Sequence, residues 1–423
     1  MINMIIFKFK RKVPLESCRK LLTNIFVRLK YLERNDSVTK KILVISSDHT
    51  GHGHKSIAEA LHEKIKMDTQ IDIQVVDGFA LGGKALLNIG KSYGPITRYS
   101  AKLWDMIWHL SAKHSTLVDK IIERMIRSNL LTLLNKVKPD LILSIHPNFN
   151  GSVINILRKE NIHVPFGTLI ADLVNIYPLW ADQRVDFILS PTEEAKEKCI
   201  QFGVPEEKIH VVGFPVRERF HRYSNKQRGK ISTINFLMMS GGEGVGNMSG
   251  MAEELLEHFD CTVSIIAGRN EKLKMELESS LKKRFGDRAK IFGFVKNIQD
   301  LMRAADIAIT RGSPNVMFEA VATNLPIIIT GALPGQEKDN PRFAEKYNLG
   351  VFCQNTEQLT SIIEDLLGKD GERLSSIKES QKNFINQQAA EDILKFLVSV
   401  EEQEYMPVKK KRFAFAFAIA SNK

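Results

Sequence analysis

One local arrangement, a buried strand followed by a glycine-rich loop and a helix, occurs twice along the chain. In the first copy, the apolar run 41–47 precedes a loop at 48–54 and a helical pattern. In the second copy, the apolar run 234–240 precedes the glycine-rich segment 241–247 and another helical pattern. Strands that are apolar along their whole length are typical of parallel sheets covered on both faces. We therefore predict an α/β protein with two Rossmann-like, doubly wound domains.

Further strands continue this alternation in both halves of the chain. They are expected at 72–77, 140–146, 166–171, 185–190, 208–216, 261–268, 290–295, 306–311 and 326–331. The polar segment 221–230 interrupts the pattern, so we predict an N-terminal domain at 37–220 and a C-terminal domain at 221–395. Ligands of such folds bind at the carboxyl ends of the strands, which predicts a site in the cleft between two facing domains.

The two ends of the chain carry its positive charge. Of the formal net charge of +11, residues 1–34 contribute +7 and residues 409–423 contribute +5, so the body is nearly neutral. A nucleic-acid enzyme more often has its basic patch on the folded body, and no nucleic-acid partner is expected. We interpret 1–36 as a basic amphipathic arm and 396–423 as a basic tail that favour an anionic membrane surface. Solvated charge runs without a partner are the alternative.

Targeting features and cysteines indicate a peripheral protein on the cytoplasmic side of a membrane. The first residues lack the order of a secretory signal, and no apolar stretch is long enough for a membrane-spanning helix. The four cysteines lie far apart and include no Cys-x-x-Cys pair, which argues against a disulfide framework or a zinc site.

The loop after the first strand reads Asp-His-Thr-Gly-His-Gly-His and contains a candidate catalytic base. Its glycines allow a tight turn into a helix N-terminus, which favours an anion or a developing negative charge. His54 stands at the end of the turn, and a histidine is suited to general-base chemistry near neutral pH. Helix capping is the structural alternative. A metal site is not expected, because no carboxylate or cysteine cluster accompanies the histidines.

Glycines also dominate the loop after the second domain's first strand. The segment Gly-Gly-Glu-Gly-Val-Gly-Asn does not fit the dinucleotide pattern G-x-G-x-x-G. Backbone N–H groups of such a turn can still hold a phosphate, and a purely structural turn is the alternative. The candidate phosphate-binding residues are Gly241, Gly242, Gly244 and Gly246.

Two later segments add polar groups at strand ends. Gly312, Ser313 and Asn315 precede a helix and so form a second candidate anion site, and Glu319 lies one turn inside that helix, where its carboxylate can bind two ribose hydroxyls. The segment 331–340 contains the adjacent pair Gln336 and Glu337, whose planar polar groups suit neighbouring sugar hydroxyls. Together the motifs predict a nucleotide-sugar transferase.

At this point the chain resembles the two-lobed (GT-B) glycosyltransferases that make glycolipids. These are the monogalactosyldiacylglycerol synthases of plants and the bacterial processive diacylglycerol glucosyltransferases; the transferase that forms lipid II is a more distant relative. The resemblance covers about residues 40–390. It is carried by 47–61, 171–180, 211–220, 238–247, 293–311 and the motif Pro-Gly-Gln-Glu-Lys-Asp-Asn at 334–340.

The resemblance implies an inverting transfer of glucose or galactose from a UDP-sugar to diacylglycerol or its glycolipid, without an essential metal or cofactor. His54 is then the base. The donor-binding residues implied are the two glycine turns for the diphosphate, Phe294 and Val295 for uracil, Glu319 for ribose, and Gln336 with Glu337 for the hexose. The acceptor-binding residues implied are Gly53, Tyr93, Trp104, Trp108, Asp172 and Trp180.

Three alternatives stay open at this stage. Two are other UDP-sugar enzymes, namely a UDP-N-acetylhexosamine transferase and a UDP-sugar epimerase. The third is a non-catalytic protein of the membrane surface that binds a UDP-sugar. It is favoured by the unusual turn Gly312–Asn315, which lacks a glycine that the family has beside the phosphates. For the aromatic side chains of 78–115, ordinary core packing is the alternative to an acceptor groove.

Overall fold

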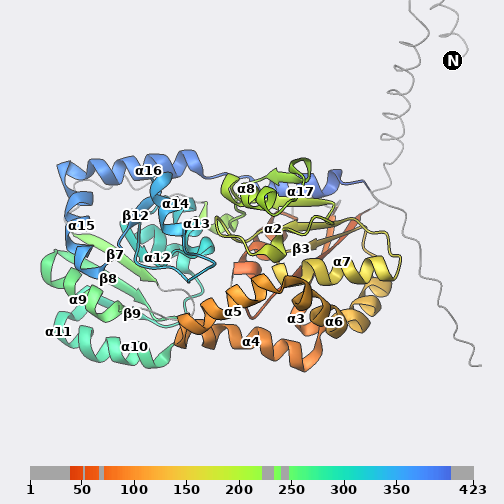
Figure 1. The fold of residues 1–423 in the computed structure, drawn as a ribbon. Helices are drawn as coiled ribbons and strands as arrows, with labels where there is room; N and C mark the ends of the chain where they lie inside the picture. The colour runs from red at the N-terminus through yellow and green to blue at the C-terminus, as the bar shows by residue number, and fades with distance from the viewer. Residues whose placement is uncertain (1–38, 51–52, 66–70, 222–232, 240–246, 402–423) are drawn as a thin grey trace, which may run out of the picture.

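Two parallel sheets, one in each lobe, form the framework of the molecule (Figure 1). The computed structural model describes residues 39–50, 53–65, 71–221, 233–239 and 247–401 of the 423-residue chain. Within this part, each sheet has six strands, all paired in parallel. The predicted fold class, two doubly wound α/β lobes, is confirmed.

The sheet of the first lobe has the strand order β2-β1-β3-β4-β5-β6. Its strands are β1 (Lys40–Ser46), β2 (Ile71–Asp77), β3 (Leu141–Ser144), β4 (Phe166–Leu169), β5 (Phe187–Ser190) and β6 (Ile209–Val211). The central strands are buried on both faces, which explains their unbroken apolar sequences.

The sheet of the second lobe has the order β12-β11-β10-β7-β8-β9. Its strands are β7 (Ile234–Met239), β8 (Cys261–Ile266), β9 (Ala289–Phe292), β10 (Ile307–Thr310), β11 (Ile327–Ile329) and β12 (Gly350–Phe352). The edge strand β12 was not among the predicted strands, because three residues beginning with glycine give too short an apolar run to be read as one.

Helices connect the strands and cover both sheets. In the first lobe they are α2 (Gly53–Ile65), α3 (Gly78–Leu81), α4 (Gly83–Tyr99), α5 (Ala101–Lys113), α6 (Ser115–Val137), α7 (Asn150–Lys159) and α8 (Glu193–Gln201). In the second they are α9 (Met248–His258), α10 (Glu271–Leu277), α11 (Lys283–Phe285), α12 (Ile298–Ala304), α13 (Pro314–Ala322), α14 (Asn340–Lys346), α15 (Leu359–Leu367) and α16 (Glu372–Phe384).

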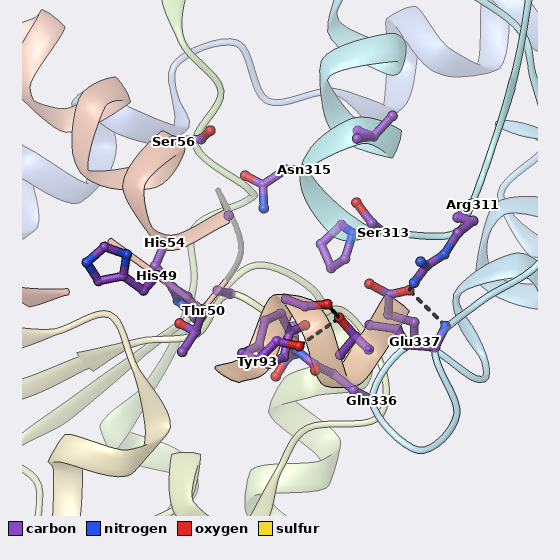
Figure 2. Close-up of a pocket in the computed structure, with 18 of the residues that line it drawn as sticks. His49, Thr50, His54, Ser56, Tyr93, Arg311, Ser313, Asn315, Gln336 and Glu337 are labelled. Carbon is purple, nitrogen blue, oxygen red and sulfur yellow. Dashed lines mark hydrogen bonds and ion pairs between the residues drawn. The ribbon is translucent and has the colours of Figure 1, made fainter. Parts of the chain in front are cut away.

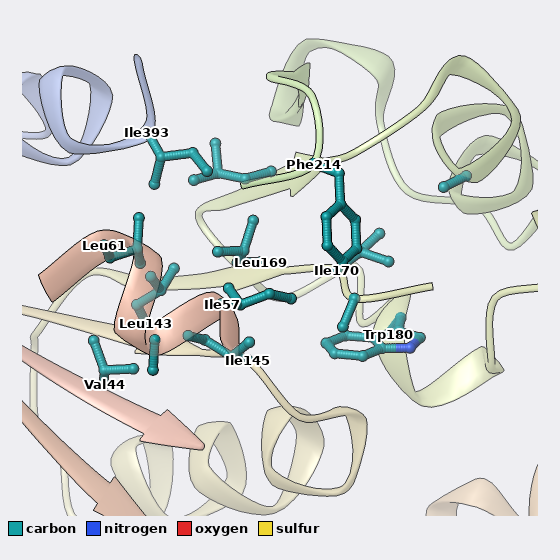
Figure 3. Close-up of a cluster of buried hydrophobic side chains, with 14 of the residues drawn as sticks. Val44, Ile57, Leu61, Leu143, Ile145, Leu169, Ile170, Trp180, Phe214 and Ile393 are labelled. Atoms are coloured by element: carbon teal, nitrogen blue, oxygen red, sulfur yellow. The ribbon is translucent and has the colours of Figure 1, made fainter. Parts of the chain in front are cut away.

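The chain returns to the first lobe in its last described helix, α17 (Ala389–Ser399). Phe396 of α17 contacts the ring of Phe187 on β5 at a centroid distance of 5.0 Å. Ile393 and Leu397 are fully buried. Figure 3 shows Ile393 near Leu61 of α2 in the first lobe. This helix therefore ties the two lobes together, although the expected division at 221–395 groups most of it with the second lobe.

Four consecutive helices, α3 to α6, stand between β2 and β3 in place of the usual single crossover helix. In Figure 1, α4 and α5 extend from the first lobe toward the second. The contact is close, since a Cβ on Gly335 of the second lobe would come within 2.8 Å of the Trp108 ring on α5. Gly335 has φ +75°, a conformation that glycine adopts without strain.

Several sequence predictions concern residues outside the described ranges. The basic arm, almost all of the basic tail beyond residue 401, and most of the polar segment 221–230 belong to this group. Within the described ranges, no helix has both the length and the apolar character needed to cross a bilayer.

Candidate functional site

The carboxyl ends of the central strands of both sheets face each other across one cavity. The order of strands reverses at β1 and β3 in the first lobe and at β7 and β10 in the second, and such reversal points are where doubly wound sheets bind ligands. The inter-lobe cavity between them has a volume of about 370 Å³. Figure 2 shows His49, Thr50 and His54 on the first-lobe side of it, and Arg311, Ser313 and Glu337 on the second-lobe side.

His54 lies in the first turn of α2 and is held by the neighbouring strand end. Its Nδ1 is 2.6 Å from the carbonyl oxygen of Ile145, just beyond β3. A carbonyl oxygen can only accept, so Nδ1 donates and carries the proton, which leaves Nε2 as the basic nitrogen. Burial lowers the pKa of His54 to about 4, so the imidazole is neutral at pH 7. A neutral imidazole with its basic nitrogen available is the state that a general base requires.

Asp172 joins the two lobes. Its Oδ2 accepts a 2.7 Å hydrogen bond from the indole N–H of Trp180, and its Oδ1 accepts a 2.8 Å bond from the side-chain amide of Gln336 in the second lobe. Burial raises the pKa of Asp172 to about 6. Trp180 itself is fully buried and lines none of the four main cavities found in the described chain. It therefore orients Asp172 from the core side.

Two helix N-termini meet at the centre of the cavity. Gly53 begins α2, and a Cβ at this position would lie 2.5 Å from the side-chain nitrogen of Asn315, near the start of α13. Ser313 is the N-cap of α13 and makes no side-chain capping bond, so its hydroxyl is available to a ligand. The Gly312 amide donates to Gly331, and its carbonyl accepts from Asn340, which fixes the turn. The paired N-termini favour an anion between the lobes.

Glu319, one turn inside α13, is buried and paired with an arginine of the connection between the lobes. Arg217 donates to Glu319 through one nitrogen and to Glu59 of α2, at 3.0 Å, through another. Burial raises the pKa of Glu319, and the charge of Arg217 opposes that rise. The expected ribose carboxylate is thus engaged by Arg217 in this state of the protein.

Glu337 is buried in the loop between β11 and α14 and fixes the loop around it. Its Oε2 accepts from the backbone amide of Leu333 at 2.9 Å and lies 3.3 Å from the guanidinium of Arg311. Both Glu337 and Gln336 line the inter-lobe cavity. The expected sugar-binding pair therefore faces the same space as His54.

A second cavity, of about 440 Å³, adjoins Glu319 and contains the expected uracil residues. Val295 lines it, and Phe294 is a large exposed ring (53% accessible) beneath the guanidinium of Arg269, 5.1 Å from the ring centroid. We call this space the Phe294 cavity. An exposed ring and a cation at the edge of a cavity suit a planar heteroaromatic group.

A third cavity, of about 270 Å³, is enclosed mainly by aromatic and aliphatic side chains, and we call it the apolar cavity. Tyr93, Trp104 and Trp108 line it, with the Tyr93 and Trp104 rings 4.9 Å apart in an edge-to-face arrangement. The indole N–H groups of both tryptophans are buried and have no hydrogen-bond partner in the structure. A buried donor without a partner costs free energy of folding. Two such donors in an apolar wall therefore favour a ligand with acceptor oxygens.

His54 and Asp172 line both the inter-lobe cavity and the apolar cavity. Tyr93, Thr50 and Gln336 do so as well. The structure thus brings the candidate base, the candidate acceptor residues and the candidate sugar-binding residues to one boundary. Gly241, Gly242, Gly244 and Gly246 lie outside the described residues, so their expected phosphate contacts stay predictions.

Several residues of these cavities were not named as site residues from the sequence, and four of them bear on the chemistry of the site. His146 is buried beside His54, at a ring centroid distance of 4.6 Å. Arg217, Arg269 and Arg311 place positive charge around the two polar cavities. Three of the four directly follow a strand or stand within three residues of its end, so the carboxyl-end rule applied to every strand would have selected them. Arg217 follows from no such rule.

Among the described residues, no group of three His, Cys, Asp or Glu side chains is placed to hold a metal ion. The positive groups that line the polar cavities include Arg217, Arg269 and Arg311, together with Lys91, Lys55 and Lys296.

Comparison with known proteins extends these observations. The family model of monogalactosyldiacylglycerol synthase matches residues 54–216, and that of group 1 glycosyl transferases matches residues 247–369. A processive diacylglycerol β-glucosyltransferase of Bacillus cereus is 27% identical over 399 residues, covering 89% of this chain and 98% of the relative.

Solved structures show the same fold at low sequence identity. MurG of Acinetobacter baumannii superposes with a TM-score of 0.55 at 11% identity, covering 85% of this chain and 100% of the other. A putative UDP-N-acetylglucosamine 2-epimerase of Listeria monocytogenes gives a TM-score of 0.59 at 15% identity, covering 87% of this chain and 100% of the other. The two-lobed architecture is therefore shared with enzymes of different activities.

Proposed function

We propose that this chain, which matches the family models of monogalactosyldiacylglycerol synthase and of group 1 glycosyl transferases and is similar to a processive diacylglycerol β-glucosyltransferase, transfers a hexose from a UDP-sugar to diacylglycerol or its glycolipid. The observation that carries the proposal is the position of His54. It stands at the boundary between two cavities. One is polar and is lined by arginines and helix N-termini, and the other is lined mainly by apolar side chains that suit a lipid. A base at that boundary contacts a hydroxyl on one side and a sugar donor on the other.

The donor occupies the second lobe in this proposal. Uracil stacks on Phe294 in the cavity that Val295 and Arg269 also line. The ribose hydroxyls bind Glu319, which requires Arg217 to release that carboxylate. The diphosphate lies between the N-termini of α2 and α13, with Ser313 and Asn315 as side-chain donors.

The hexose is read by Gln336 and Glu337 at the floor of the inter-lobe cavity. The acceptor glycerol enters through the apolar cavity, where the free indole N–H groups of Trp104 and Trp108 donate to its ester oxygens. Asp172 holds Gln336 in position and is held in turn by Trp180. We assign Asp172 and Trp180 to positioning, not to proton transfer.

The reaction is a single displacement at the anomeric carbon. Nε2 of His54 takes the proton of the acceptor hydroxyl, the hydroxyl oxygen bonds to the anomeric carbon, and the bond from that carbon to the diphosphate breaks. The leaving UDP carries away the electron pair, and the helix N-termini and Arg311 stabilise its charge. The negative diphosphate also raises the basicity of His54 in the complex.

The acceptor implies that the protein works at a membrane surface. Its peripheral association there, on the cytoplasmic face, is part of the proposal, supported by the basic composition of residues 1–34 and 409–423.

The test is a transfer assay with purified protein, labelled UDP-glucose or UDP-galactose, and vesicles containing diacylglycerol and an anionic lipid. We expect labelled lipid in the organic phase, and its loss in His54→Ala. Release of UDP without labelled lipid, an epimerised UDP-sugar, or transfer only from UDP-N-acetylhexosamine would each contradict the proposal. Binding of UDP-sugar without turnover would leave the protein a non-catalytic binder.

A further inference from the structure

His146 is a second buried histidine beside His54 and takes no part in the proton transfer described above. It stands two residues after the end of β3 and is only 5% accessible. Its ring centroid lies 4.6 Å from that of His54. Of the four main cavities in the described chain, His146 lines only the apolar cavity, and His54 lines that cavity too. A ligand that reaches His54 from the apolar cavity therefore lies next to His146 as well.

The ring of His146 is fixed by two aromatic rings and by the backbone. Phe79 and Phe149 pack against it at centroid distances of 5.1 and 5.3 Å. The backbone N–H of Asn148 donates to Nδ1 at 3.3 Å, so the side chain also caps the short turn that follows. These contacts set the direction of the remaining ring nitrogen, Nε2.

The two histidines are held in opposite tautomers. A backbone N–H can only donate, so Nδ1 of His146 is unprotonated and Nε2 carries the hydrogen. In His54 the order is reversed, because Nδ1 donates to the carbonyl oxygen of Ile145 and Nε2 is the basic nitrogen. Burial lowers the pKa of His146 well below its ordinary value, and the neighbouring His54 lowers it further, so this ring is neutral. The pair thus offers one acceptor nitrogen and one N–H donor.

The Nε2–H of His146 has no acceptor within the described part of the chain. The hydrogen bonds of His146 there use its backbone N–H, its carbonyl oxygen and Nδ1. A buried donor of this kind costs free energy until an acceptor pairs with it. Since the ring lines the apolar cavity, the ligand of that cavity is placed to supply the acceptor. His146 cannot replace His54 as the base, because its unprotonated nitrogen faces the Asn148 N–H.

An acceptor nitrogen beside an N–H donor matches a ligand that carries a hydroxyl and an oxygen on the neighbouring carbon. In 1,2-diacylglycerol the free hydroxyl stands next to the carbon that bears the second ester. In the hexose of a glycolipid, every hydroxyl has an oxygen on an adjacent carbon. A simple long-chain alcohol has the hydroxyl alone.

We propose that His146 is an acceptor-binding residue whose Nε2–H donates to the oxygen next to the attacking hydroxyl, while His54 receives the hydroxyl proton. The inference rests on the function proposed above, because it takes the acceptor to be diacylglycerol or its glycolipid. It adds a requirement for two neighbouring oxygens in the acceptor. The same contact serves both acceptors, so it also suits a first product that is used again as an acceptor.

Two substitutions separate this contact from the capping of the turn. The side chain of His146→Asn keeps an acceptor where Nδ1 stands and caps well, but it does not reach the position of Nε2. The amide of His146→Gln reaches the position of Nε2 and can donate there, but it is poorly placed to cap. A role in acceptor binding and a role in holding the turn therefore predict opposite orders of activity.

Transfer assays with the full-length protein measure that order. We expect His146→Asn to lower kcat/KM for 1,2-diacylglycerol about tenfold and His146→Gln to recover most of this loss, with the KM for the UDP-sugar unchanged in both. His163→Asn, at an exposed histidine of the first lobe, is the control. Thermal unfolding of each variant shows whether it is folded.

An altered acceptor tests the same contact from the side of the substrate. In this analogue a carbon-linked alkyl chain replaces the ester next to the hydroxyl, so the neighbouring oxygen is missing. The wild type should use it about tenfold less well than 1,2-diacylglycerol, whereas His146→Asn should use the two alike. Binding of short-chain forms dissolved as monomers gives the same comparison without turnover, read by the fluorescence of Trp104 and Trp108 in the apolar cavity.

Equal binding and use of both acceptors by the wild type would overturn the inference, and this comparison needs no variant. Equal losses in His146→Asn and His146→Gln would overturn it too, as would an analogue penalty that persists in full in His146→Asn. Discrimination between the two acceptors in binding that His146→Asn loses, without transfer of a hexose to either, would refute the proposed function and leave the binding role of His146 in place.

Discussion

The two sheets have almost the same strand order, and the one difference between them lies next to the site. Read from β9, the second sheet follows the order third, second, first, fourth, fifth, sixth strand of its lobe. The first sheet has second, first, third, fourth, fifth, sixth, so it lacks an edge strand equivalent to β9. In its place, between β2 and β3, stand the helices α3 to α6.

This substitution explains why the two sides of one cleft are suited to different ligands. In the second lobe, β9 leads into Phe294 and Val295, and the cavity there is edged by arginines. In the first lobe, the helices that replace such a strand build an apolar cavity and a wall toward the second lobe. The shared fold places ligands at the strand ends of both lobes. The inserted helices determine that the ligand of the first lobe must be apolar.

The comparison predicts that changes in the first lobe affect turnover while changes in the second affect donor binding. The largest effect is expected from His54→Asn, which removes the base. We expect kcat to fall by about 10²–10⁴-fold, with a small change in the KM for the UDP-sugar. Steady-state kinetics with both substrates varied measures this. His258→Asn, at an exposed histidine on α9, is the matched control; a loss that appears mainly in the donor KM would break the comparison.

A smaller effect is expected from Glu319→Gln in the second lobe. The amide keeps the shape of the side chain but loses the charged hydrogen bonds to ribose, so the KM for the donor should rise by about ten- to a hundredfold. Calorimetric titration with UDP measures the same loss without turnover. Glu276→Gln, at an exposed glutamate of α10, should leave both values unchanged. A fall in kcat at constant donor affinity would contradict the assignment of Glu319.

Asp172 connects the lobes, and its titration tests how far turnover depends on the contact between the two lobes. Its pKa is about 6, and the ionised form is the one that holds both Trp180 and Gln336. Activity should therefore decline below pH 6, and Asp172→Asn should move this decline toward the pKa of His54, about 4. A pH profile of kcat/KM measures the shift. An unchanged acid limb in the variant would exclude Asp172 as its origin.

The same variant carries a prediction for stability. The pKa of Asp172 in the folded protein is above its ordinary value of 3.8, so the stability contributed by the protonated carboxyl is present below pH 4 and is lost as the pH rises through 6. Asp172→Asn removes a buried charge above pH 6. We expect the difference in thermal stability between variant and wild type to shift in the variant's favour as the pH rises from 4 to 8, and a constant difference would contradict this.

The smallest effect is expected from Phe294→Ala. The ring is half-exposed and already lies beneath Arg269, so stacking on uracil should contribute modestly, and the KM for the donor should rise by about threefold. Phe202→Ala, at an exposed phenylalanine of the first lobe, is the control. No change in donor affinity would place uracil elsewhere in the second lobe.

Local sequence determined the framework of this protein. The unbroken apolar runs at β1, β7 and β10 are compatible with little except buried parallel strands, and the glycines and small polar residues after them require turns into helices. The positions of His54, Gln336 and Glu337 followed from the loops they occupy, which come after β1 and β11 respectively. For these residues, the position in the sequence after a strand is enough to place them at the site.

Only the tertiary structure decided how distant segments meet. The bond from Gln336 to Asp172, the pairing of Arg217 with Glu319, and the packing of Trp108 against Gly335 join residues separated by more than a hundred positions. Neither periodicity nor motif spacing encodes such contacts, because they depend on the relative placement of two lobes. The exposure of apolar residues along α5 is of the same kind, since an apolar residue is buried or exposed according to what the rest of the chain leaves uncovered.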